Sequence, residues 1–458
     1  MIVMKFGGTS VANYEAISRT VSIVHSKLAE KPIVVVSALS KVTDLLYKIA
    51  DNAAEGNRAA ADEKLEELRL RHAGLASELL AGDSELCAEA VGKVNEICGT
   101  LASFVGAVCS LGELTDRSKA KIISHGEWLS STIICYAMNH RGIKTGFIDA
   151  RKMIVTSPEY MKGEPVIEEI VKRVPEEVSK AYQGADAVIT QGFIASTVKG
   201  EPAVLGRGGS DYSASLIGMA ADASRIEIWT DVDGVRTADP RRVANTRNIS
   251  KISFEEAAEM AHFGAKVLHP LTIEPAVMKN IPVYVLNSMK PEGEGTAILQ
   301  SDQIEDGVKS VSFKENILLL NIFSTKMINV SGFLNKVFGI FAENKVSVDL
   351  ISTSEANISL TVDGSQNLDS VVRELSEFAE VDVDNDKSQV SIIGKNIVNL
   401  RGLLRQTMAS LKDCNIYMIS QGASFVNISF VVDRASLTEV VQEVHRYLFE
   451  SCGNDREA

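Results

Sequence analysis

The chain has 458 residues, of which 45% are apolar and 23% charged, and its 60 acidic against 47 basic side chains give a net charge of −13. A chain of this length exceeds one ordinary hydrophobic core and is expected to form two or three domains. The acidic balance disfavours nucleic acid and anionic membranes as partners, so we expect a small-molecule ligand, no nucleic acid and no membrane.

The first residues, MIVMKFGG, lack the basic stretch and long apolar core of a signal peptide. We also expect no apolar run that approaches the roughly 18 residues of a membrane span, and therefore a cytoplasmic protein. Six cysteines without a CxxC pair favour free thiols in a reducing compartment. Cys87, Cys98 and Cys109 recur every eleven residues, which predicts one helical stripe packed in a core rather than a metal site.

Strands and helices alternate over the first 300 residues. A stretch rich in Ala, Leu and Glu between Asp44 and Gly112 predicts a helical insertion, and 118–142 predicts another helix that ends at Gly142. Apolar runs on both faces of strands, separated by helices, are typical of a largely parallel sheet covered on two sides, so this part is of the α/β class. The runs that predict strands are 2–6, 31–39, 144–149, 185–193, 224–231 and 281–288.

Two glycine pairs in the sequence lie beside a cation. In KFGGTSV (5–11), the glycines let the backbone approach an anion and Lys5 adds a compensating charge, although a plain turn is the alternative. In LGRGGSDYSA (205–214), Arg207 offers a planar fork for a carboxylate or phosphate, whereas Ser210 or Asp211 is alternatively a mere helix cap. The Walker A pattern is absent from the sequence, and the two loops together favour an anion site.

Three further stretches are candidates. The loop WTDVDGVRTADPRR (229–242) follows a predicted strand, where α/β sheets bind nucleotides, and a polar surface loop is the alternative. FGAKVLHP (263–270) places Lys266 after a glycine, and Glu127 lies in a predicted helix, where a glutamate is ordinarily solvated or salt-bridged. None of the seven histidines has metal-ligand spacing, so we expect no metal-binding residues, and His262 and His269 are interpreted as structural.

The last third of the chain contains an internal repeat. SVDLISTSEANISLTVD (347–363) and NIYMISQGASFVNISFVVD (415–433) correspond, with Asn357 aligned to Asn427 and Asp363 to Asp433. Helical patterns flank each copy, which predicts two β-helix-β-β-helix units of about 70 residues with ligand sites where copies meet. The flanking helical patterns are 333–344, 367–378, 400–412 and 436–449.

Taken in order, these residues resemble a known family. KFGGTSV, VVSALSKVTD, QGFIA, LGRGGSDYSA, IWTDVDGVRTADPR and FGAKVLHP resemble the motifs of aspartate kinases, and the repeat resembles their paired ACT regulatory domains. The resemblance covers nearly the whole chain. It implies an amino-acid-kinase domain over 1–300, in which helices sandwich a mostly parallel sheet. Two ferredoxin-like α+β ACT domains follow over 314–385 and 386–458, and 301–313 is a candidate to complete the second.

The resemblance also implies transfer of the γ-phosphoryl group of ATP, with Mg²⁺, to the side-chain carboxylate of L-aspartate. Lys5, Arg207 and Asp211 form the implied catalytic set, Arg207 facing the α-carboxylate and Glu127 the ammonium of aspartate. The implied ATP-binding residues are Lys5, Gly7, Gly8, Thr230, Asp231, Arg236, Arg241 and Lys266. The implied aspartate-binding residues are Ser37, Thr43, Glu127, Phe193, Arg207, Gly208, Gly209, Ser210 and Asp211.

The segment KMINVSGFLNKVFGIFAENKVSVDLISTSE (326–355) resembles the effector-binding region of lysine-inhibited members. Lysine is therefore the first choice of effector and threonine the second, and ACT pairing between chains implies a homodimer or a higher homo-oligomer. The implied effector residues are Met327, Asn329, Gly332, Ser347, Val348 and Asp349. Asn329 stands where the family suggests histidine, Arg236 where it often has an aromatic residue, and Lys41 where it often has glycine.

Two other functions are weighed against this one. The chain is alternatively another amino-acid or carbamate kinase of the same fold, which VSALSKVTD, GRGGSDYSA and the ACT repeat disfavour. It is alternatively an amino-acid sensor that retains an inactive kinase domain. Loss of Lys5, Arg207 or Asp211 would favour the sensor, and all three residues are present.

Overall fold

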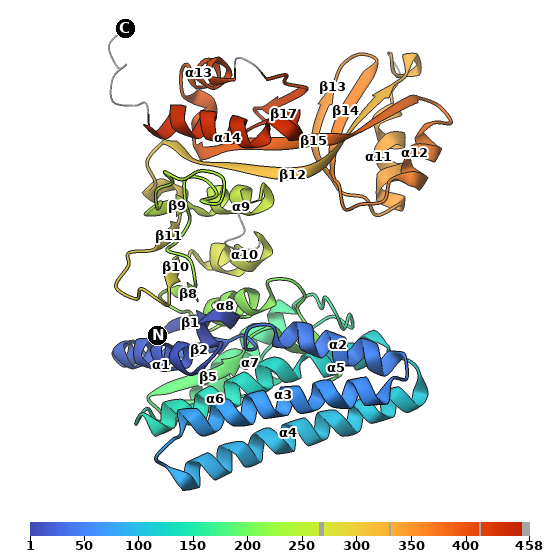
Figure 1. Cartoon of the computed structure of the whole chain (residues 1–458). Coiled ribbons are helices and arrows are strands. Elements are labelled where there is room, and N and C mark those ends of the chain that lie inside the picture. The colour runs from blue at the N-terminus through green and yellow to red at the C-terminus, as the bar shows by residue number, and fades with distance from the viewer. Residues whose placement is uncertain (265–269, 329–330, 412–413, 451–458) are drawn as a thin grey trace. The chain divides into compact units, whose positions relative to one another are not determined.

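The computed structural model describes residues 1–264, 270–328, 331–411 and 414–450 (Figure 1). The chain divides into two compact units. The first comprises 1–235 and 268–300, and the second comprises 236–267 and 301–458. The stretch 236–267, which the sequence suggests as part of the kinase domain, is thus associated with the unit that contains the repeat.

The central sheet of the first unit has the strand order β3-β5-β2-β1-β8-β10-β11. All neighbouring pairs are parallel except β10 with β11, and every residue of β1, β2 and β5 is buried. The predicted, mostly parallel sheet is therefore confirmed. Its strands are β1 (Ile2–Phe6), β2 (Pro32–Val36), β3 (Thr145–Ile148), β5 (Ala187–Gln191), β8 (Ile226–Thr230), β10 (Val283–Asn287) and β11 (Thr296–Leu299).

Helices cover this sheet and extend beyond it. In Figure 1, α3 and α4 run side by side along α6, and they share one apolar core with α1 and α2. Side-chain caps from Asn57 and Asp83 start α3 and α4, and Gly112 ends α4 in the left-handed conformation. The helices are α1 (Tyr14–Ser26), α2 (Val42–Ala54), α3 (Arg58–Leu79), α4 (Ser84–Leu111), α5 (Asp116–Ile123), α6 (His125–His140), α7 (Ile167–Ala181), α8 (Gly209–Ala220) and α10 (Pro270–Lys279).

The helix predicted over 118–142 is interrupted at Ser124, so that it forms α5 and α6. The Ser124 hydroxyl donates to the Lys121 carbonyl, and His125 Nδ1 also lies 2.8 Å from that oxygen. These side chains compete with the helical ladder at this turn. The predicted end of the second helix is correct, because Gly142 follows α6 with a φ of 81°.

Helix α4 corrects one expectation from the sequence. Among the described residues, it is long and apolar enough to cross a membrane by length and composition, with a mean hydropathy of 1.4 over its best 18 residues. This window meets the criterion by average composition although polar residues interrupt any continuous apolar run, so the expectation drawn from apolar runs misses it. Cys98 is buried and Cys87 and Cys109 are half-buried against the core, so the predicted packing of the cysteine stripe is confirmed.

A second sheet of the first unit consists of β4 (Val155–Thr156), β6 (Ile194–Thr197) and β7 (Pro202–Val204). Strands β6 and β7 are antiparallel and lead directly from the end of β5 to the start of α8. This hairpin was not predicted from the sequence, since its strands are too short for a clear pattern. It brings the chain at Phe193 next to the chain at Leu205, whose N–H donates to the Phe193 carbonyl at 3.0 Å.

The sheet of the second unit has the order β13-β14-β12-β15-β17-β16, and its pairs are antiparallel. Strands β14 and β17 begin at the two equivalent asparagines and end at the two equivalent aspartates of the repeat. The first part of β12, up to Lys314, pairs with the end of β15, and its second part pairs with the start of β15 and with β14. The strands are β12 (Gly307–Phe323), β13 (Val348–Thr353), β14 (Asn357–Asp363), β15 (Glu380–Lys395), β16 (Met418–Gln421) and β17 (Asn427–Asp433).

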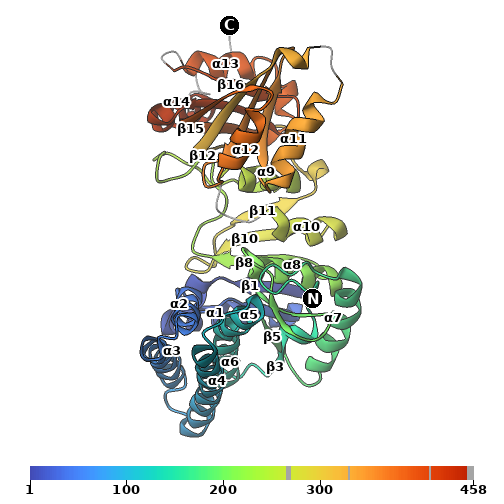
Figure 2. The same cartoon turned by 90° about the vertical axis from the view of Figure 1, so that its right-hand side faces the viewer.

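Each repeat has its own apolar core, and Figure 2 shows the helix pairs at separate places on the sheet. Helices α11 (Phe333–Glu343) and α12 (Asp369–Leu375) pack on the first repeat, and α13 (Leu403–Ser410) and α14 (Leu437–His445) on the second. The ferredoxin-like order of the two ACT units is thereby confirmed. The stretch before them supplies β9 (Lys251–Ser253) and α9 (Phe254–His262), which begins with a capping box between Ser253 and Glu256.

Candidate active site

The first glycine loop follows β1 and contacts the loop that follows β2. The Gly7 N–H donates to the Trp229 carbonyl at 3.0 Å. Gly8 starts a short 3-10 helix, and the Gly8 carbonyl accepts from the Ser40 N–H at 3.1 Å. A Cβ atom on Gly8 would lie 3.0 Å from the Ala38 carbonyl oxygen. A side chain at this position would press on that carbonyl, so glycine suits the close approach of the loops after β1 and β2.

The second glycine loop precedes α8. Gly206 and Gly208 have φ angles of 77° and 70°, and Gly208 is the N-cap of the helix. Ser210 and Asp211 lie in the first turn instead, so the alternative in which either residue caps α8 is wrong. A Cβ atom on Gly209 would lie 2.7 Å from Cδ2 of Phe193, which shows how tightly the loops after β5 and β7 pack. Arg207 is exposed at the tip of this loop.

Lys5 and Asp211 connect the two glycine loops. Nζ of Lys5 lies 2.5 Å from Oδ1 of Asp211, and the two side chains are 10% and 18% exposed. Lys5 comes from β1 and Asp211 from the first turn of α8, so this ion pair links the strand that precedes Gly7 to the helix that follows Gly208. The pair thus brings together two of the three predicted catalytic residues.

Glu127 lies in the first turn of α6 and is 3% exposed. Its Oε2 atom is buried and has no hydrogen-bond partner among the described residues. Burial raises the pKa of Glu127 to about 8, against smaller opposing effects of the backbone N–H groups of Ala38 and Glu127 itself. The expected solvated or salt-bridged glutamate is not observed, and this carboxyl group is instead suited to receive a cation.

The loop after β2 completes the surroundings of Glu127. The Ser37 N–H donates to the Phe6 carbonyl at 3.1 Å, and the Ser37 carbonyl accepts from the Ser130 hydroxyl of α6 at 2.8 Å. Lys41 has a φ of 65°, a conformation that glycine adopts without strain, which explains why glycine suits this position. Thr43 is half-buried in the first turn of α2.

Ser213 and Gln191 support the site but were not predicted as site residues, although both lie within the quoted motifs. The Phe193 N–H donates to the Ser213 hydroxyl at 2.9 Å, and this bond holds Phe193 at a φ of 65°. The buried Gln191 amide donates to Ser131 at 2.9 Å and accepts from the Ala150 N–H at 2.8 Å. Their position in QGFIA and SDYSA was the available signal.

The predicted nucleotide residues fall into three groups. Thr230 ends β8, which neighbours β1, and Asp231 follows it; the Thr230 carbonyl accepts from the Ser288 N–H at 2.8 Å. In the second unit, Arg236 donates to the hydroxyl and carbonyl of Thr246, both at 2.7 Å, and Arg241 pairs with Asp239 at 2.5 Å. Lys266 lies outside the described residues.

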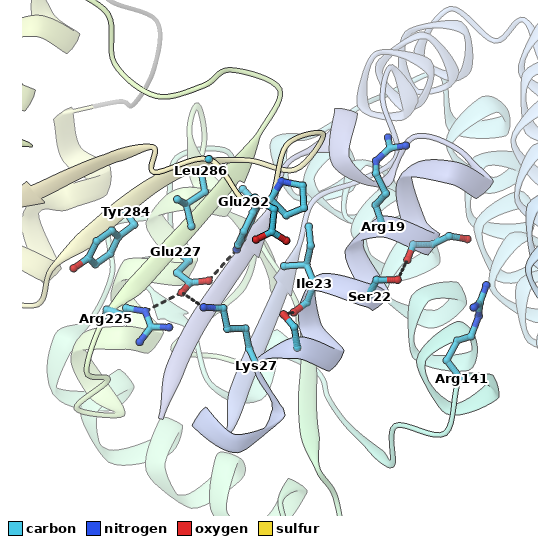
Figure 3. A pocket seen from close by; sticks show the side chains of 15 residues that line it. Arg19, Ser22, Ile23, Lys27, Arg141, Arg225, Glu227, Tyr284, Leu286 and Glu292 are labelled. Atoms are coloured by element: carbon cyan, nitrogen blue, oxygen red, sulfur yellow. Dashed lines mark hydrogen bonds and ion pairs between the residues drawn. The ribbon is translucent and has the colours of Figure 1, made fainter. Parts of the chain in front are cut away.

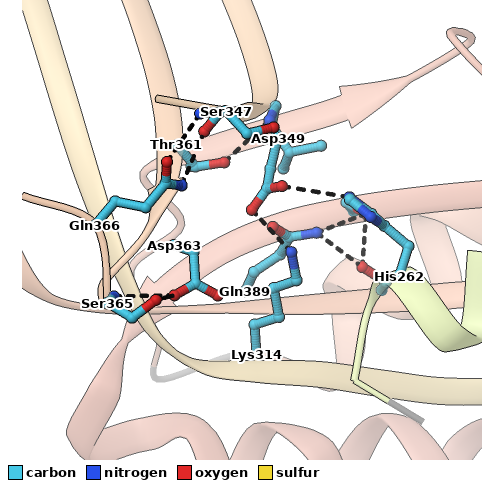
Figure 4. Close-up of polar contacts among 12 residues, drawn as sticks. His262, Lys314, Ser347, Asp349, Thr361, Asp363, Ser365, Gln366 and Gln389 are labelled. Atoms are coloured by element: carbon cyan, nitrogen blue, oxygen red, sulfur yellow. Dashed lines mark hydrogen bonds and ion pairs between the residues drawn. The ribbon is translucent and has the colours of Figure 1, made fainter. Parts of the chain in front are cut away.

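The predicted effector residues lie in and around the first repeat. Met327 ends a 3-10 turn, and Gly332 is the left-handed N-cap of α11. Ser347 exchanges two backbone hydrogen bonds with the side chain of Gln366, at 2.8 and 3.1 Å. Val348 and Asp349 begin β13, and Figure 4 shows the Asp349 carboxylate between the side chains of His262 and Lys314. Asn329 lies outside the described residues.

An open pocket of about 950 Å³ lies elsewhere in the first unit, between α1 and strands β8 and β10 (Figure 3). Among the described residues, no predicted site residue lines it. Its most buried acid, Glu227, accepts from Arg225 at 2.8 Å and from the Trp229 indole at 3.1 Å. The chemistry that the sequence suggests therefore converges on the glycine loops rather than on this pocket.

Comparisons with known proteins identify the family of both parts of the chain. The amino acid kinase family model matches residues 1–287, and an ACT domain model matches 320–377 and 390–448. The chain is 37% identical over 459 residues to lysine-sensitive aspartokinase 3 of Escherichia coli (strain K12), covering 98% of this chain and 99% of the relative. It is 36% identical to the chloroplastic aspartokinase 1 of Arabidopsis thaliana, covering 98% and 80%.

Two solved structures are also similar. The E. coli aspartokinase III complex with aspartate and ADP, described as the R-state, has a TM-score of 0.85 and 35% identity, covering 98% of this chain and 100% of that one. The complex of the same enzyme with lysine and aspartate, described as the T-state, has a TM-score of 0.80 and 35% identity with the same coverage.

Proposed function

The chain belongs to the aspartokinase family, and we propose that it transfers the γ-phosphoryl group of ATP to the side-chain carboxylate of L-aspartate. The products are ADP and 4-phospho-L-aspartate, the first intermediate of the lysine, threonine and methionine branches. The observation that carries this proposal is the ion pair of Lys5 and Asp211 at 2.5 Å, which joins the two glycine loops. The acceptor and the donor are both anionic, so the site needs a cation between them, and Lys5 supplies one when a phosphate oxygen takes the place of Asp211.

We propose that aspartate lies between Glu127 and Arg207. Aspartate carries one ammonium and two carboxylates, and the buried Oε2 of Glu127 has no protein donor among the described residues. Arg207 presents its exposed guanidinium to the α-carboxylate in this arrangement. The residues proposed to shape the remainder of the site are Ser37, Thr43, Phe193, Gly208, Gly209, Ser210 and Asp211.

The nucleotide proposal rests on the edge of the sheet where β1 and β8 end. Lys5 and the backbone N–H groups at Gly7 and Gly8 would hold the transferring phosphate. Thr230 and Asp231, with Arg236, Arg241 and Lys266, are proposed to hold the rest of ATP. Arg236 would offer a guanidinium plane where related enzymes often have an aromatic ring beside adenine, after exchanging its present bonds to Thr246.

Mg²⁺ fits this site without dedicated protein ligands. The part of the chain that the structure describes has no group of three or more His, Cys, Asp or Glu arranged to hold a metal ion. Asp211, the acid nearest Lys5, is already ion-paired. Mg²⁺ bound through phosphate oxygens and water would neutralise charge on the phosphates.

The proposed mechanism uses positioning and charge neutralisation. A carboxylate is already a nucleophile near neutral pH, so the chain needs no general base to activate it. Glu127 and Arg207 orient aspartate, and the rigid loop at Gly8 fixes the backbone that faces the phosphate. The Lys5 ammonium then stabilises charge that develops on the transferring group.

We propose three further properties of the whole protein. Amino-acid effectors bind through the ACT repeats, with lysine first and threonine second, and they bias the kinase by preferring one conformation. The ACT repeats also associate between chains, giving a homodimer or higher homo-oligomer in the cytoplasm. The proposed domain bounds are 1–300, 314–385 and 386–458, and the pairing of Gly307–Lys314 with the end of β15 supports assigning 301–313 to the last domain.

The test is ATP-dependent acyl-phosphate formation from L-aspartate, trapped with hydroxylamine, with and without Mg²⁺. Trapped product that requires aspartate, ATP and Mg²⁺ supports the proposal. A reaction with glutamate but not aspartate would overturn the substrate assignment and leave the fold assignment intact. An absence of product with any amino acid, combined with binding of lysine or threonine, would favour the sensor.

A further inference from the structure

Helix α9 contacts both ACT repeats through two polar side chains. Glu259 accepts a hydrogen bond from the Asn427 amide of β17, in the second repeat, at 2.8 Å. His262 places Nε2 at 3.3 Å from Oδ1 of Asp349 on β13, in the first repeat (Figure 4). The helix is therefore attached to each repeat by a separate contact.

Of the two residues that hold α9, Asp349 and Asn427, Asp349 is the one that also pairs with a lysine. Its side chain is 7% exposed, and its other oxygen, Oδ2, accepts from Nζ of Lys314 at 2.8 Å. Burial alone would raise the pKa of Asp349, but the hydrogen bonds from His262 and Lys314 outweigh burial, and its pKa is lowered. Both carboxylate oxygens are thus paired with side chains of the chain itself, His262 and Lys314.

We propose that the ammonium group of the amino-acid effector competes with His262 and Lys314 for Asp349, so that effector binding releases α9 from the first repeat. This inference rests on the proposed effector site, in which Asp349 is one of the binding residues. Asp349 is 7% exposed and each of its oxygens lies against a neighbouring side chain, so an ammonium group reaches this carboxylate only in the space that His262 and Lys314 now occupy. Effector binding and attachment of α9 are then mutually exclusive.

A Lys314 side chain displaced from Asp349 has a second carboxylate nearby, that of Asp363. It lines a pocket of about 670 Å³ in the second unit together with Glu315 and Asp363. Asp363 accepts hydrogen bonds from the backbone and hydroxyl of Ser365, which leave acceptor positions on its carboxylate. The ammonium of Lys314 therefore need not stay buried without a counter-charge.

Release of α9 can affect phosphoryl transfer because α9 lies in the chain between two proposed ATP-binding residues. His262 ends α9 just before Lys266, and the segment that contains α9 follows Asp231; both Lys266 and Asp231 are proposed ATP-binding residues. The Glu259 contact with Asn427 does not involve Asp349 and keeps α9 on the second repeat. The contact at His262 is thus switched while the contact at Glu259 acts as a pivot.

The experiment measures L-lysine binding by calorimetry and L-lysine inhibition of aspartate phosphorylation for the full chain and two variants, Lys314→Gln and His262→Gln. Each variant removes one competitor, so the dissociation constant for lysine should fall by about three- to tenfold. His262→Gln should also lower the activity without lysine, because α9 is already released. Lys387→Gln is the matched control, since Lys387 is 5% exposed and pairs with Asp384 and Asp433 in the second repeat.

The outcomes separate this inference from the proposals on which it rests. Unchanged lysine affinity in both Lys314→Gln and His262→Gln, with lysine binding lost in Asp349→Asn, would overturn the competition and leave the effector site standing. Normal lysine binding by Asp349→Asn would overturn both. Tighter binding in Lys387→Gln as well would also overturn the inference, since the effect would then not be specific to Asp349. Phosphorylation of aspartate by the native chain without lysine is scored separately and tests only the catalytic proposal.

Discussion

Nζ of Lys5 lies 2.5 Å from Oδ1 of Asp211, although one residue is on the first strand and the other on a helix more than two hundred residues later. The pair joins the loop at Gly7 to the loop at Gly208, and each loop depends on glycine for its conformation or its close packing. A cation held in this position is neutralised before substrates arrive. It can therefore exchange Asp211 for a phosphate oxygen with little rearrangement of the backbone.

Lys5→Ala should lower the turnover number by about a hundred- to a thousandfold and change the affinity for aspartate far less, because Lys5 stabilises charge that develops during transfer. Hydroxamate trapping gives the turnover number, and calorimetry gives the affinity. Asp211→Asn should have a smaller effect in the Lys5→Ala background than in the native protein, since the two groups form one pair. Lys152→Ala is the control on an exposed lysine. Unchanged turnover in Lys5→Ala would remove Lys5 from catalysis.

Gly8→Ala should destabilise the protein by about 1–3 kcal/mol, because its Cβ atom would press on the Ala38 carbonyl oxygen at 3.0 Å. Gly7→Ala is the matched control on the neighbouring residue. Its φ is −71°, and its Cβ atom would meet Nζ of Lys5 and the Trp229 carbonyl oxygen only at 3.6 Å. Thermal unfolding of the two variants should therefore differ, with Gly8→Ala unfolding at the lower temperature. Equal unfolding temperatures would mean that the loops after β1 and β2 are not locked together.

Glu127 should release a proton when aspartate binds at pH 7. Burial raises its pKa to about 8, so the group is mostly protonated at that pH, whereas a bound ammonium group favours the carboxylate. Affinity for aspartate should rise by up to about tenfold per pH unit below pH 8 and level off above it. Calorimetry in buffers of different ionisation enthalpy measures the released proton. Glu127→Gln should bind weakly and release none, and the same proton release in that variant would exclude Glu127 as its source.

Much of the fold was predictable because local patterns of apolar and turn residues mark its strands. Strand β1 occupies the predicted 2–6, and β14 and β17 begin and end at the asparagines and aspartates aligned in the repeat. These strands are buried or alternate regularly, and turns bound them, so their patterns stand out from neighbouring helices. The break at Ser124 was missed, since it arises from two side chains that share one carbonyl.

The site was predictable as a set of residues, but not as a set of contacts. Resemblance suggested Lys5, Asp211 and Glu127, and their roles remain predictions. No local pattern encodes the Lys5–Asp211 pair or the attachment of His262 to Asp349, because both join residues that are distant in the sequence. The burial of Glu127 had a weak signal. Gly126 and the small polar residues after Leu129 on α6 indicate a helix that is packed on every side.

His72 should make the first unit sensitive to acid. It is fully buried on α3, its Nδ1 lies 2.7 Å from the Leu68 carbonyl oxygen, and its Nε2 has no hydrogen-bond partner within the described residues. Burial lowers its pKa from 6.5 to about 4, so the folded state holds His72 neutral where the unfolded chain would bind a proton. The stability that depends on neutral His72 is complete above pH 6.5 and is lost as the pH falls through about 4.

His72→Leu should therefore lose less stability than the native protein between pH 6.5 and pH 4, by roughly 3 kcal/mol at the acidic end. Thermal unfolding across that range measures the difference, each protein being compared with its own value at pH 7.5 so that any packing change cancels. His25→Leu is the control, because His25 is exposed on α1. Parallel loss of stability in the native protein and in His72→Leu would show that protonation of His72 is not what acid acts on. Other buried groups, such as His125, whose pKa burial also lowers, would then carry the acid sensitivity.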